Sequence, residues 1–437
     1  MADIDYICRP IALDPRAKVG FKIYRLAHND NASSVRYMQH LNKRVRLNLE
    51  ETGDDEIFAH IDRDVQEDSG LQDIEETVGD PKCKSVQSHH QRDIFYIGGR
   101  SLDIGTGNLT VDQLYVEKLT PSAGVTQARP LVFFHGGAVS GTTWLNTPDG
   151  RKGFATYFLD QGYQIYLLDH TSVGRSSQMD TRDYVLWNTT TQESVQAAFT
   201  APELAPTYPQ ARLHTQWPGS GRIGDPSFEA FRKGVLPFTS NFTLGELTMR
   251  SAGCELLALL GPSYLVSHSL GSTFPLLLSN DCPGNVAGNI NLEHSNHPFW
   301  NYGITIDSGS STRPWGLSNT PLDYEPAVVD ASDLQQAVVG NDTLALRNCH
   351  LQVEPARRLP KISSVPYLCL TGEASVHVTY DHCVIEFLKQ AGGTPDWIKL
   401  ADRNITGNGH FMHLEKNNLD IARLVEGWIV RQESLRL

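Results

Sequence analysis

Apolar and polar residues follow one another in a regular rhythm over residues 91–437. Short apolar runs recur, and several segments between them repeat apolar residues at three- or four-residue spacing, which is typical of helices. We expect strands at 93–97, 113–117, 130–134, 164–168, 264–266, 288–292, 365–370 and 397–400. We expect helices at 153–160, 246–260, 272–278, 380–391 and 414–430. Strands that alternate with helices predict an α/β fold, with a mostly parallel central sheet and helices on both of its faces.

Two long segments depart from this rhythm. Residues 178–245 are rich in Pro, Thr, Trp and Phe and have little periodicity, so we expect a lid or cap insertion there. Residues 1–90 contain a possible strand at 21–26, a helix-like stretch at 31–49 and an acidic run at 50–80. Acidic runs are usually solvated or disordered. We therefore expect an N-terminal extension with an acidic linker over 1–90, followed by one α/β domain over 91–437.

Composition narrows the classes of function. The formal net charge of the 437 residues is −13, which argues against nucleic-acid binding as the main role. No apolar run approaches the roughly 18–20 residues that a membrane span needs. The seven cysteines include no CxxC pair, which argues against a zinc site, and their odd number fits a reducing compartment while leaving room for one or two disulfides.

The N-terminus lacks the basic start and apolar centre of a secretory signal, so we favour a cytoplasmic location. Sequons of the form Asn-x-Ser/Thr, which accept glycans in secreted proteins, leave secretion as the alternative. The sequons lie at Asn31, Asn108, Asn188, Asn241, Asn341 and Asn404.

The candidate nucleophile lies in the sequence Ser-His-Ser-Leu-Gly at 267–271, between a predicted strand and a predicted helix. A sharp turn at this point requires small residues two before and two after the serine. Ser267 and Gly271 meet that requirement around Ser269. We expect the turn to expose the Ser269 hydroxyl and to aim the Leu270 N–H at a developing oxyanion. From these five residues alone, an ordinary strand-to-helix turn is an equally good interpretation.

A serine hydroxyl becomes a nucleophile only when a base removes its proton. His410 lies in a glycine-flanked loop after the last predicted strand and is our candidate base, with His413 as the nearby rival. The base in turn needs a carboxylate that fixes its tautomer and stabilises the imidazolium. Three carboxylates are candidates for this role: Glu293 and Glu373, which follow predicted strands, and Asp381.

A glycine-rich stretch after the third predicted strand is a candidate oxyanion loop. It begins His135-Gly136-Gly137-Ala138, and glycines allow backbone N–H groups to approach an anion closely. We expect Gly137 and Ala138 to act as donors beside Leu270, and a plain strand-to-helix turn is the alternative. Two further histidines, at 294 and 297, are candidates for lining the pocket.

Taken together, these residues resemble the α/β-hydrolase superfamily over roughly residues 91–432. The order serine, acid, histidine matches that of the superfamily. Within it, the chain looks like a branch of secreted bacterial esterases and their fungal relatives. The stretches that carry the likeness are 135–137, 146–151, 174–176, 267–271, 291–293, 407–410 and 414–417. In that branch the catalytic acid follows the sixth strand, so the resemblance favours Glu293 over Glu373.

These observations predict a serine hydrolase, without metal or cofactor, that acts on a small-molecule carboxylic ester or lactone. Ser269 attacks the carbonyl, His410 transfers the proton, and Glu293 orients His410. The resemblance to fungal proteins implies an ester of secondary metabolism. Three alternatives remain on this fold: an acyltransferase, a lyase or cyclase that uses the triad as a base without an acyl-enzyme, and a non-catalytic ligand-binding relative.

Overall fold

The computed structural model describes residues 5–8, 23–26, 87–187, 190–295, 297–302 and 309–436. The chain divides into two compact units, Met1–Val86 with Asp149–Arg151, and Gln87–Pro148 with Lys152–Leu437. The described part of the first unit is an antiparallel pair of strands, β1 (Asp5–Cys8) and β2 (Ile23–Leu26). The expected helix at 31–49 and the acidic run at 50–80 lie outside the described residues.

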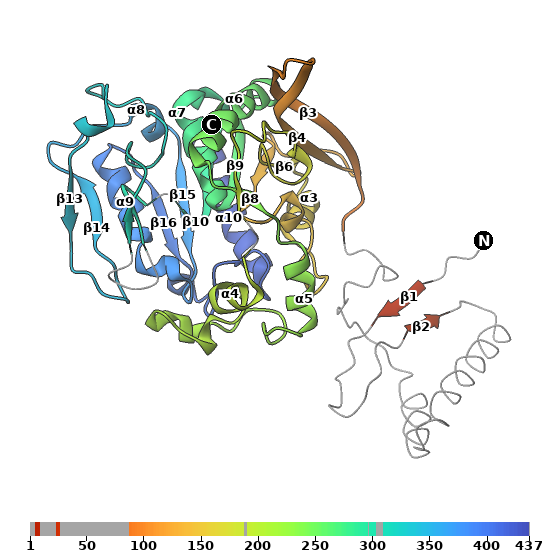
Figure 1. The fold of residues 1–437 in the computed structure, drawn as a ribbon. Helices are drawn as coiled ribbons and strands as arrows, with labels where there is room; N and C mark the ends of the chain where they lie inside the picture. The colour runs from red at the N-terminus through yellow and green to blue at the C-terminus, as the bar shows by residue number, and fades with distance from the viewer. Residues whose placement is uncertain are drawn as a thin grey trace. The chain divides into compact units, whose positions relative to one another are not determined.

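The second unit contains a sheet of eight strands in the order β16-β15-β10-β9-β5-β6-β4-β3 (Figure 1). The strands are β3 (His90–Asp103), β4 (Asn108–Pro121), β5 (Leu131–Phe134), β6 (Ile165–Asp169), β9 (Ser263–Ser269), β10 (Val286–His294), β15 (Tyr367–Thr371) and β16 (Asp396–Lys399). The pairs β3–β4 and β4–β6 are antiparallel, and all other neighbours in this sheet are parallel. The predicted mostly parallel sheet is therefore confirmed.

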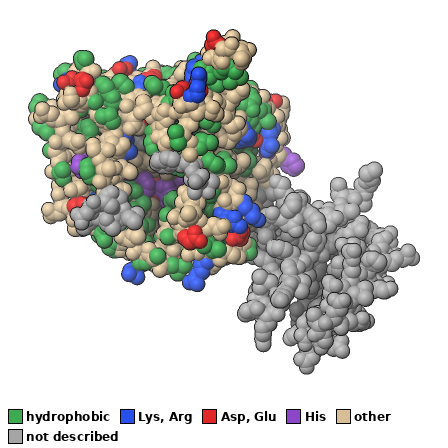
Figure 2. Space-filling view, viewed as in Figure 1, with side chains coloured by type: hydrophobic (Ala, Val, Ile, Leu, Met, Phe, Trp, Pro, Cys, Tyr) green, Lys and Arg blue, Asp and Glu red, His purple; other side chains and the backbone are tan. Residues whose placement is uncertain are grey.

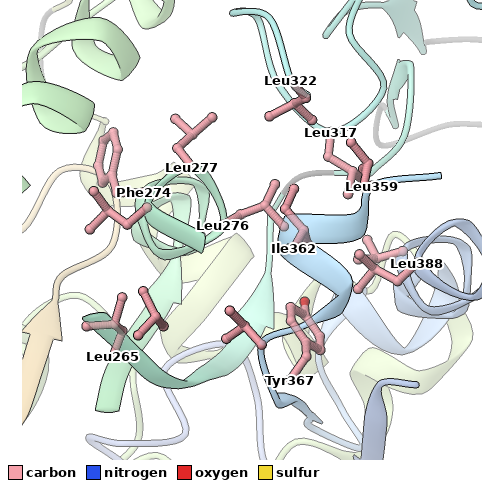
Figure 3. Close-up of a cluster of buried hydrophobic side chains, with 14 of the residues drawn as sticks. Leu265, Phe274, Leu276, Leu277, Leu317, Leu322, Leu359, Ile362, Tyr367 and Leu388 are labelled. Carbon is pink, nitrogen blue, oxygen red and sulfur yellow. The ribbon is translucent and has the colours of Figure 1, made fainter. Parts of the chain in front are cut away.

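Helices cover both faces of the sheet because its central strands are apolar on both sides. In β5, Leu131 and Phe133 pack into one core with α3 (Phe154–Asp160) and α10 (Asn418–Ser434). Val132 and Phe134 pack into the other core, with α6 (Phe242–Leu260), α7 (Thr273–Asp281) and α9 (Asp381–Gln390). Figure 3 shows side chains of this second core converging from the strands, from α7 and from the loops beyond it. None of the described helices combines the length and hydropathy that a membrane crossing needs.

The expected insertion at 178–245 consists mainly of short helices separated by loops. The elements are β7 (Leu186–Trp187), α4 (Gln192–Val195), η3 (Gln196–Thr200), η4 (Pro202–Leu204), η5 (Pro209–Leu213), α5 (Pro226–Lys233) and β8 (Phe238–Thr239). The Asp225 side chain begins α5 by accepting hydrogen bonds from two N–H groups of its first turn. The Phe228 and Phe231 side chains of α5 then pack with Phe411, in the loop that precedes α10. The insertion is thereby packed against the loop that carries His410.

A second irregular region joins β10 to β15. Its elements are β11 (Trp300–Asn301), β12 (Ser310–Ser311), η9 (Ala331–Asp333), β13 (Gln336–Val339), β14 (Cys349–Gln352) and α8 (Pro360–Ser363). A disulfide between Cys349 and Cys383 ties β14 to α9, and a second one joins Cys254 to Cys282. Disulfides persist mainly in oxidising compartments, so they give no support to the cytoplasmic location that we favoured from the sequence.

Candidate active site

The predicted sharp turn is present at Ser269. β9 ends at this residue and the short helix η6 (Leu270–Ser272) begins at the next one. Ser269 has φ 52° and ψ −129°, a strained conformation for a residue with a side chain. A Cβ atom at Gly271 would lie 2.1 Å from the His135 carbonyl oxygen, so only glycine fits there. The Ser267 hydroxyl is buried and donates to Asn291 Oδ1 at 2.9 Å, which explains how serine fits at the other small position.

The structure brings Ser269, His410 and Glu293 together. The Ser269 Oγ atom lies 2.9 Å from His410 Nε2, and His410 Nδ1 lies 2.5 Å from Glu293 Oε2. Since the carboxylate accepts a hydrogen bond from Nδ1–H, the lone pair of the neutral imidazole is on Nε2 and faces the serine hydroxyl. This is the geometry that removal of the serine proton requires.

The Glu293 carboxylate is fully buried at the end of β10. Besides the histidine, it accepts a hydrogen bond from the Ser375 hydroxyl at 2.6 Å and one from the Gly372 N–H at 2.9 Å. Both donors follow β15, the neighbouring strand. They fix the orientation of the carboxylate and offset part of the free-energy cost of burying its charge.

The other two predicted acids make different contacts. Glu373 Oε2 accepts a hydrogen bond from the Gly407 N–H at 2.8 Å, so it holds the loop that carries the candidate base. Asp381 Oδ1 lies 2.8 Å from His377 Nδ1. Of the three carboxylates, the structure places Glu293 beside the candidate base.

The predicted oxyanion donors lie together in the wall of a cavity. Gly137, Ala138 and Leu270 all line it. Leu270 is the first residue of η6, and the first N–H of a helix has no partner within that helix. Ala138 has φ 58°, and its carbonyl oxygen accepts a hydrogen bond from Leu236 N–H in the insertion at 2.8 Å. The insertion therefore helps to fix the loop that presents these N–H groups.

The cavity has a volume of about 300 Å³, at the lower end of the range for small-molecule sites. Its walls come from the oxyanion loop, from the end of the insertion and from the segments after β6 and β10. Residues from these parts of the wall include Gly136, Val173, Phe238, Phe242, Ser295 and Arg313, and Phe274 of α7 completes the wall after β9. Ser295 links the cavity to the nucleophile, because its Oγ atom lies 3.4 Å from Ser269 Oγ. Figure 2 shows histidine side chains inside a hollow on the viewed face of this unit.

One aromatic residue of the insertion covers the candidate base. The Phe199 ring, in η3, lies nearly parallel to the His410 ring with centroids 5.4 Å apart. This contact and the insertion residues in the cavity wall agree with the lid expected over 178–245. The lid assignment itself stays a proposal.

Two of the remaining histidines of the region, His294 and His297, differ from the expectation that they line the pocket. His294 and His297 are buried but are not part of the cavity wall. His413 Nε2 lies 3.1 Å from Thr143 Oγ1 instead of contacting the nucleophile. His268 Nε2 donates to the backbone carbonyl of the candidate base at 2.9 Å and so supports that residue from behind.

Burial dominates the electrostatics of the site. It lowers the pKa of His410 well below its ordinary value, which keeps the imidazole neutral and able to accept a proton. Burial also raises the pKa of Glu293 to about 8. The nearby charge of His377 and the hydrogen bonds from Ser375 and Gly372 act against this rise in the pKa of Glu293. Ionisation of the carboxylate therefore depends on these neighbours.

At the candidate site, two overlapping groups of side chains could in principle hold a metal ion. The first consists of Glu293, His377 and His410, and the second of His297, His377 and Asp381. In both groups, hydrogen bonds between protein atoms already join the principal ligand atoms, His410 Nδ1 to Glu293 and His377 Nδ1 to Asp381. The contacts of these side chains are thus accounted for without a cation.

Sequence analysis missed several residues of the site. Ser375, Ser295 and Phe199 contact the candidate triad and were not identified. Ser375 is 82 positions from its partner Glu293 and lies in no recognisable motif. The nearest signal for Ser375 was the end of the strand at Thr371. The sequence suggested Glu373 there as a catalytic acid, whereas the structure places there a donor to Glu293, the Ser375 hydroxyl.

Comparisons with known proteins show which proteins the chain is similar to. No protein-family model matches the chain. Among curated proteins, the chain is 37% identical over 340 residues to the probable secreted lipase phiG of a fungal species (strain ATCC 74256), across 77% of this chain and 89% of the relative. Among solved structures, it is similar to a novel bacterial esterase, with a TM-score of 0.52, 19% identity, and coverage of 83% of this chain and 99% of that one. The similarity to the bacterial esterase shows a shared fold.

Proposed function

Because the chain belongs to the α/β-hydrolase superfamily, we propose that it is a serine hydrolase that cleaves a carboxylic ester or lactone. The observation that carries this proposal is the continuous hydrogen-bonded line from Ser269 through His410 to Glu293, with distances of 2.9 and 2.5 Å. A ligand-binding protein would not need a buried carboxylate, an imidazole and a strained serine aligned in this way. The relative that is named a lipase supports the same class of reaction.

The first half of the reaction forms an acyl-enzyme. Ser269 Oγ attacks the carbonyl carbon while its proton passes to His410 Nε2, and Glu293 stabilises the resulting imidazolium. The oxyanion of the tetrahedral intermediate accepts hydrogen bonds from the N–H groups of Leu270 and of Ala138 or Gly137. When the intermediate collapses, the imidazolium gives its proton to the leaving alkoxide, and the alcohol departs.

The second half of the reaction releases the acid. His410 removes a proton from water, and the hydroxide attacks the acyl carbonyl carbon. The new tetrahedral intermediate expels Ser269 Oγ, which recovers its proton from the imidazolium. The cavity of about 300 Å³ suits an acyl or aromatic group of modest size. A substrate from fungal secondary metabolism is part of this proposal, and it is supported by the fungal origin of the relative.

The site of action is also proposed. The relative is described as secreted, and two disulfides join described parts of this chain. Asn108, Asn341 and Asn404 lie in sequons and are exposed, as glycan acceptors must be. We therefore propose that the protein acts outside the cytoplasm.

Acyl transfer is the second candidate function. Phe199 covers the candidate base, and a cover that limits the access of water favours attack on the acyl-enzyme by an alcohol. The product ratio in the presence of added alcohols distinguishes the two reactions. A new ester as the main product would identify a transferase, and free acid as the main product a hydrolase.

Labelling with a fluorophosphonate probe tests the proposed function, because the probe reacts only with an activated serine. We expect one adduct on the intact wild-type protein, none on Ser269→Ala, and slower labelling of Glu293→Gln than of Glu373→Gln. Hydrolysis of p-nitrophenyl esters by the wild type should follow. Absence of an adduct and of ester hydrolysis from well-folded wild-type protein would refute the proposal.

A further inference from the structure

A second pair of imidazole and carboxylate lies beside the candidate triad. The pair consists of His377, in η10 (Val376–Thr379), and Asp381, at the start of α9. His377 Nδ1 lies 2.8 Å from Asp381 Oδ1, and its Nε2 atom lies 4.0 Å from Glu293 Oε2. The two ring nitrogens of His377 thus face two different carboxylates, and all three side chains are buried.

The rings of His377 and His410 are stacked, with centroids 4.9 Å apart and planes 14° apart. Both rings therefore approach Glu293 from the same side, His410 to make a hydrogen bond and His377 at a longer distance. His410 donates a hydrogen bond from Nδ1–H to Glu293, whereas His377 donates one from Nδ1–H to Asp381. Each histidine thus has its own carboxylate as hydrogen-bond acceptor.

Several hydrogen bonds hold the second pair in place. Asp381 accepts another hydrogen bond from Thr371 Oγ1 at 2.6 Å, at the end of β15. Ser375 Oγ accepts the His377 N–H at 3.3 Å and donates to Glu293 at 2.6 Å. The backbone of His377 is therefore tied to the same carboxylate that its side chain faces. This arrangement leaves the imidazole little freedom to move away from Glu293.

The charge balance depends on His377. The other titratable groups that surround these three side chains are five histidines, one thiol and three phenols: His268, His294, His297, His382, His410, Cys369, Tyr208, Tyr367 and Tyr380. Burial favours their neutral forms, because it lowers the pKa of the histidines and raises the pKa of the thiol and of the phenols. For His377, burial acts to lower the pKa, but the charges of Asp381 and Glu293 outweigh it and raise the pKa. The direction of this shift favours the charged form of His377, which faces two buried carboxylates.

An ionised carboxylate in a buried site is costly unless a charge or hydrogen bonds compensate it. Glu293 has to be ionised to stabilise the imidazolium through the hydrogen bond that it accepts from His410 Nδ1–H. We propose that His377, held by Asp381, is a positioning residue that favours the ionised form of Glu293 by placing a positive charge 4.0 Å from its carboxylate. This inference rests on the proposed function, since it assigns a supporting role within the same site.

The expected consequence has a definite sign. Activity rises with pH as Glu293 loses its proton, so the acidic limb of the kcat/KM profile reports the pKa of Glu293. Removing the positive charge raises that pKa, because the carboxylate loses an opposite charge. The acidic limb should therefore move to higher pH, by about one unit or more, which is the usual effect of an opposite charge at this distance.

The test uses His377→Gln and the double variant His377→Gln/Asp381→Asn, with a p-nitrophenyl ester as substrate. His377→Gln should shift the limb upward. The double variant should shift it less, because it also removes the negative charge of Asp381, which raises the pKa of Glu293. His413→Gln is the matched control, since His413 is buried near the site but is kept neutral by burial. That variant should leave the position of the limb in place even if it lowers the rate.

A measurement on folded wild-type protein covers the case in which the His377 variants do not fold. Nitrogen-15 NMR of labelled histidines should show a doubly protonated imidazole at pH 7 that Asp381→Asn loses. His214 contacts Glu203 and Glu415, and its pKa is raised as well, so the signal of His377 is the one that His214→Gln retains. If Asp381→Asn does not fold either, a His214→Gln spectrum at pH 7 without a doubly protonated imidazole would overturn the inference.

The outcomes separate the inference from the proposed function. Wild-type protein that neither reacts with the fluorophosphonate nor cleaves esters would refute the function itself. Wild-type protein that does both, together with a His377→Gln variant whose acidic limb coincides with that of the wild type, would overturn the role of His377 and leave the function in place. A lower rate without a shift of the limb would count as the second outcome, because it indicates a packing role only.

Discussion

Gly271 lies against His135 so closely that a Cβ atom at position 271 would stand 2.1 Å from the His135 carbonyl oxygen. This contact joins the turn that carries the nucleophile to the first residue of the oxyanion loop. The two loops therefore cannot separate to admit a side chain without a change in the position of Ser269 relative to Gly137 and Ala138. Glycine is therefore needed at position 271 to keep Ser269 in place relative to Gly137 and Ala138.

Gly271→Ala should consequently harm both stability and reactivity. We expect a loss of about 1–3 kcal/mol in the free energy of unfolding, the usual cost of overpacking, and slower labelling by the fluorophosphonate. Gly284→Ala is the control, because nothing lies within 4 Å of a Cβ atom at that position. Thermal unfolding and labelling rates of the two variants provide the comparison. Equal behaviour would contradict the steric explanation.

The choice of Glu293 over Glu373 as the catalytic acid gives a second prediction. Glu293→Gln should lower kcat by roughly 100- to 10,000-fold, because glutamine does not stabilise the imidazolium and favours the wrong tautomer. Glu373→Gln should have a far smaller effect, since Glu373 holds the Gly407 N–H and not the imidazole. Steady-state kinetics of both variants with one ester provide the measurement. A comparable loss in Glu373→Gln would show that the acid has been misassigned.

The central strands of the sheet could be predicted from the sequence because they are apolar and short. The residues of β5 are all buried, and they read as a continuous apolar run. The ends of helices were harder to predict, because side chains far from the apolar pattern determine them. The helix expected from residue 414 begins at Asn418, since Glu415 instead accepts the Gly409 N–H at 2.9 Å and fixes the preceding loop. α6 begins at Phe242, four residues before the expected start, because Asn241 caps it.

The site could be predicted only in part. The serine and the glycine-flanked histidine have local signals, whereas three carboxylates are candidates and only tertiary contacts distinguish them. Glu293 and His410 are 117 positions apart, and nothing in either segment specifies the other. The family resemblance, not the local pattern, favoured Glu293. His377 and Asp381 are four residues apart, in η10 and at the start of α9, but their relation to Glu293 depends on how β10 and β15 lie side by side.

The contact of His214 with two carboxylates predicts a pH-dependent stability. Its Nε2 atom lies 2.9 Å from Glu415 and its Nδ1 atom 3.0 Å from Glu203. Burial acts to lower the pKa of His214, but these carboxylates outweigh it and raise the pKa above the ordinary value. The stability that follows is fully present below a pH of about 6.5 and is lost as pH rises through the raised pKa.

His214→Gln should therefore be destabilised more at low pH than at high pH. Near pH 6 we expect a loss of about 1.5–3 kcal/mol, the usual value of hydrogen bonds to charged groups. The difference in melting temperature between wild type and variant should shrink as pH rises towards 9. Differential scanning calorimetry across this range provides the measurement. A difference that is constant with pH would mean that His214 stays neutral in the folded protein.

Exposed sequons predict where glycans are attached if the protein passes through a secretory pathway. The Asn108, Asn341 and Asn404 side chains are exposed, in a strand end and in two loops. We expect glycans at these three positions when the chain is secreted from yeast with an added signal sequence. Asn31 and Asn188 lie outside the described residues. Peptide mass spectrometry after enzymatic deglycosylation in heavy-oxygen water identifies the occupied positions.

Asn241 is the internal control for this prediction. Its side-chain oxygen accepts the Leu244 N–H at 3.1 Å, and its side-chain nitrogen donates to the Asp183 carbonyl oxygen at 3.0 Å. A glycan on that nitrogen would disturb the contact with Asp183 and the cap at the start of α6. We therefore expect lower occupancy at Asn241 than at the three exposed sequons. High occupancy at Asn241 together with a native melting temperature would show that the cap does not protect the sequon, because the glycan would then be attached without cost to the folded chain.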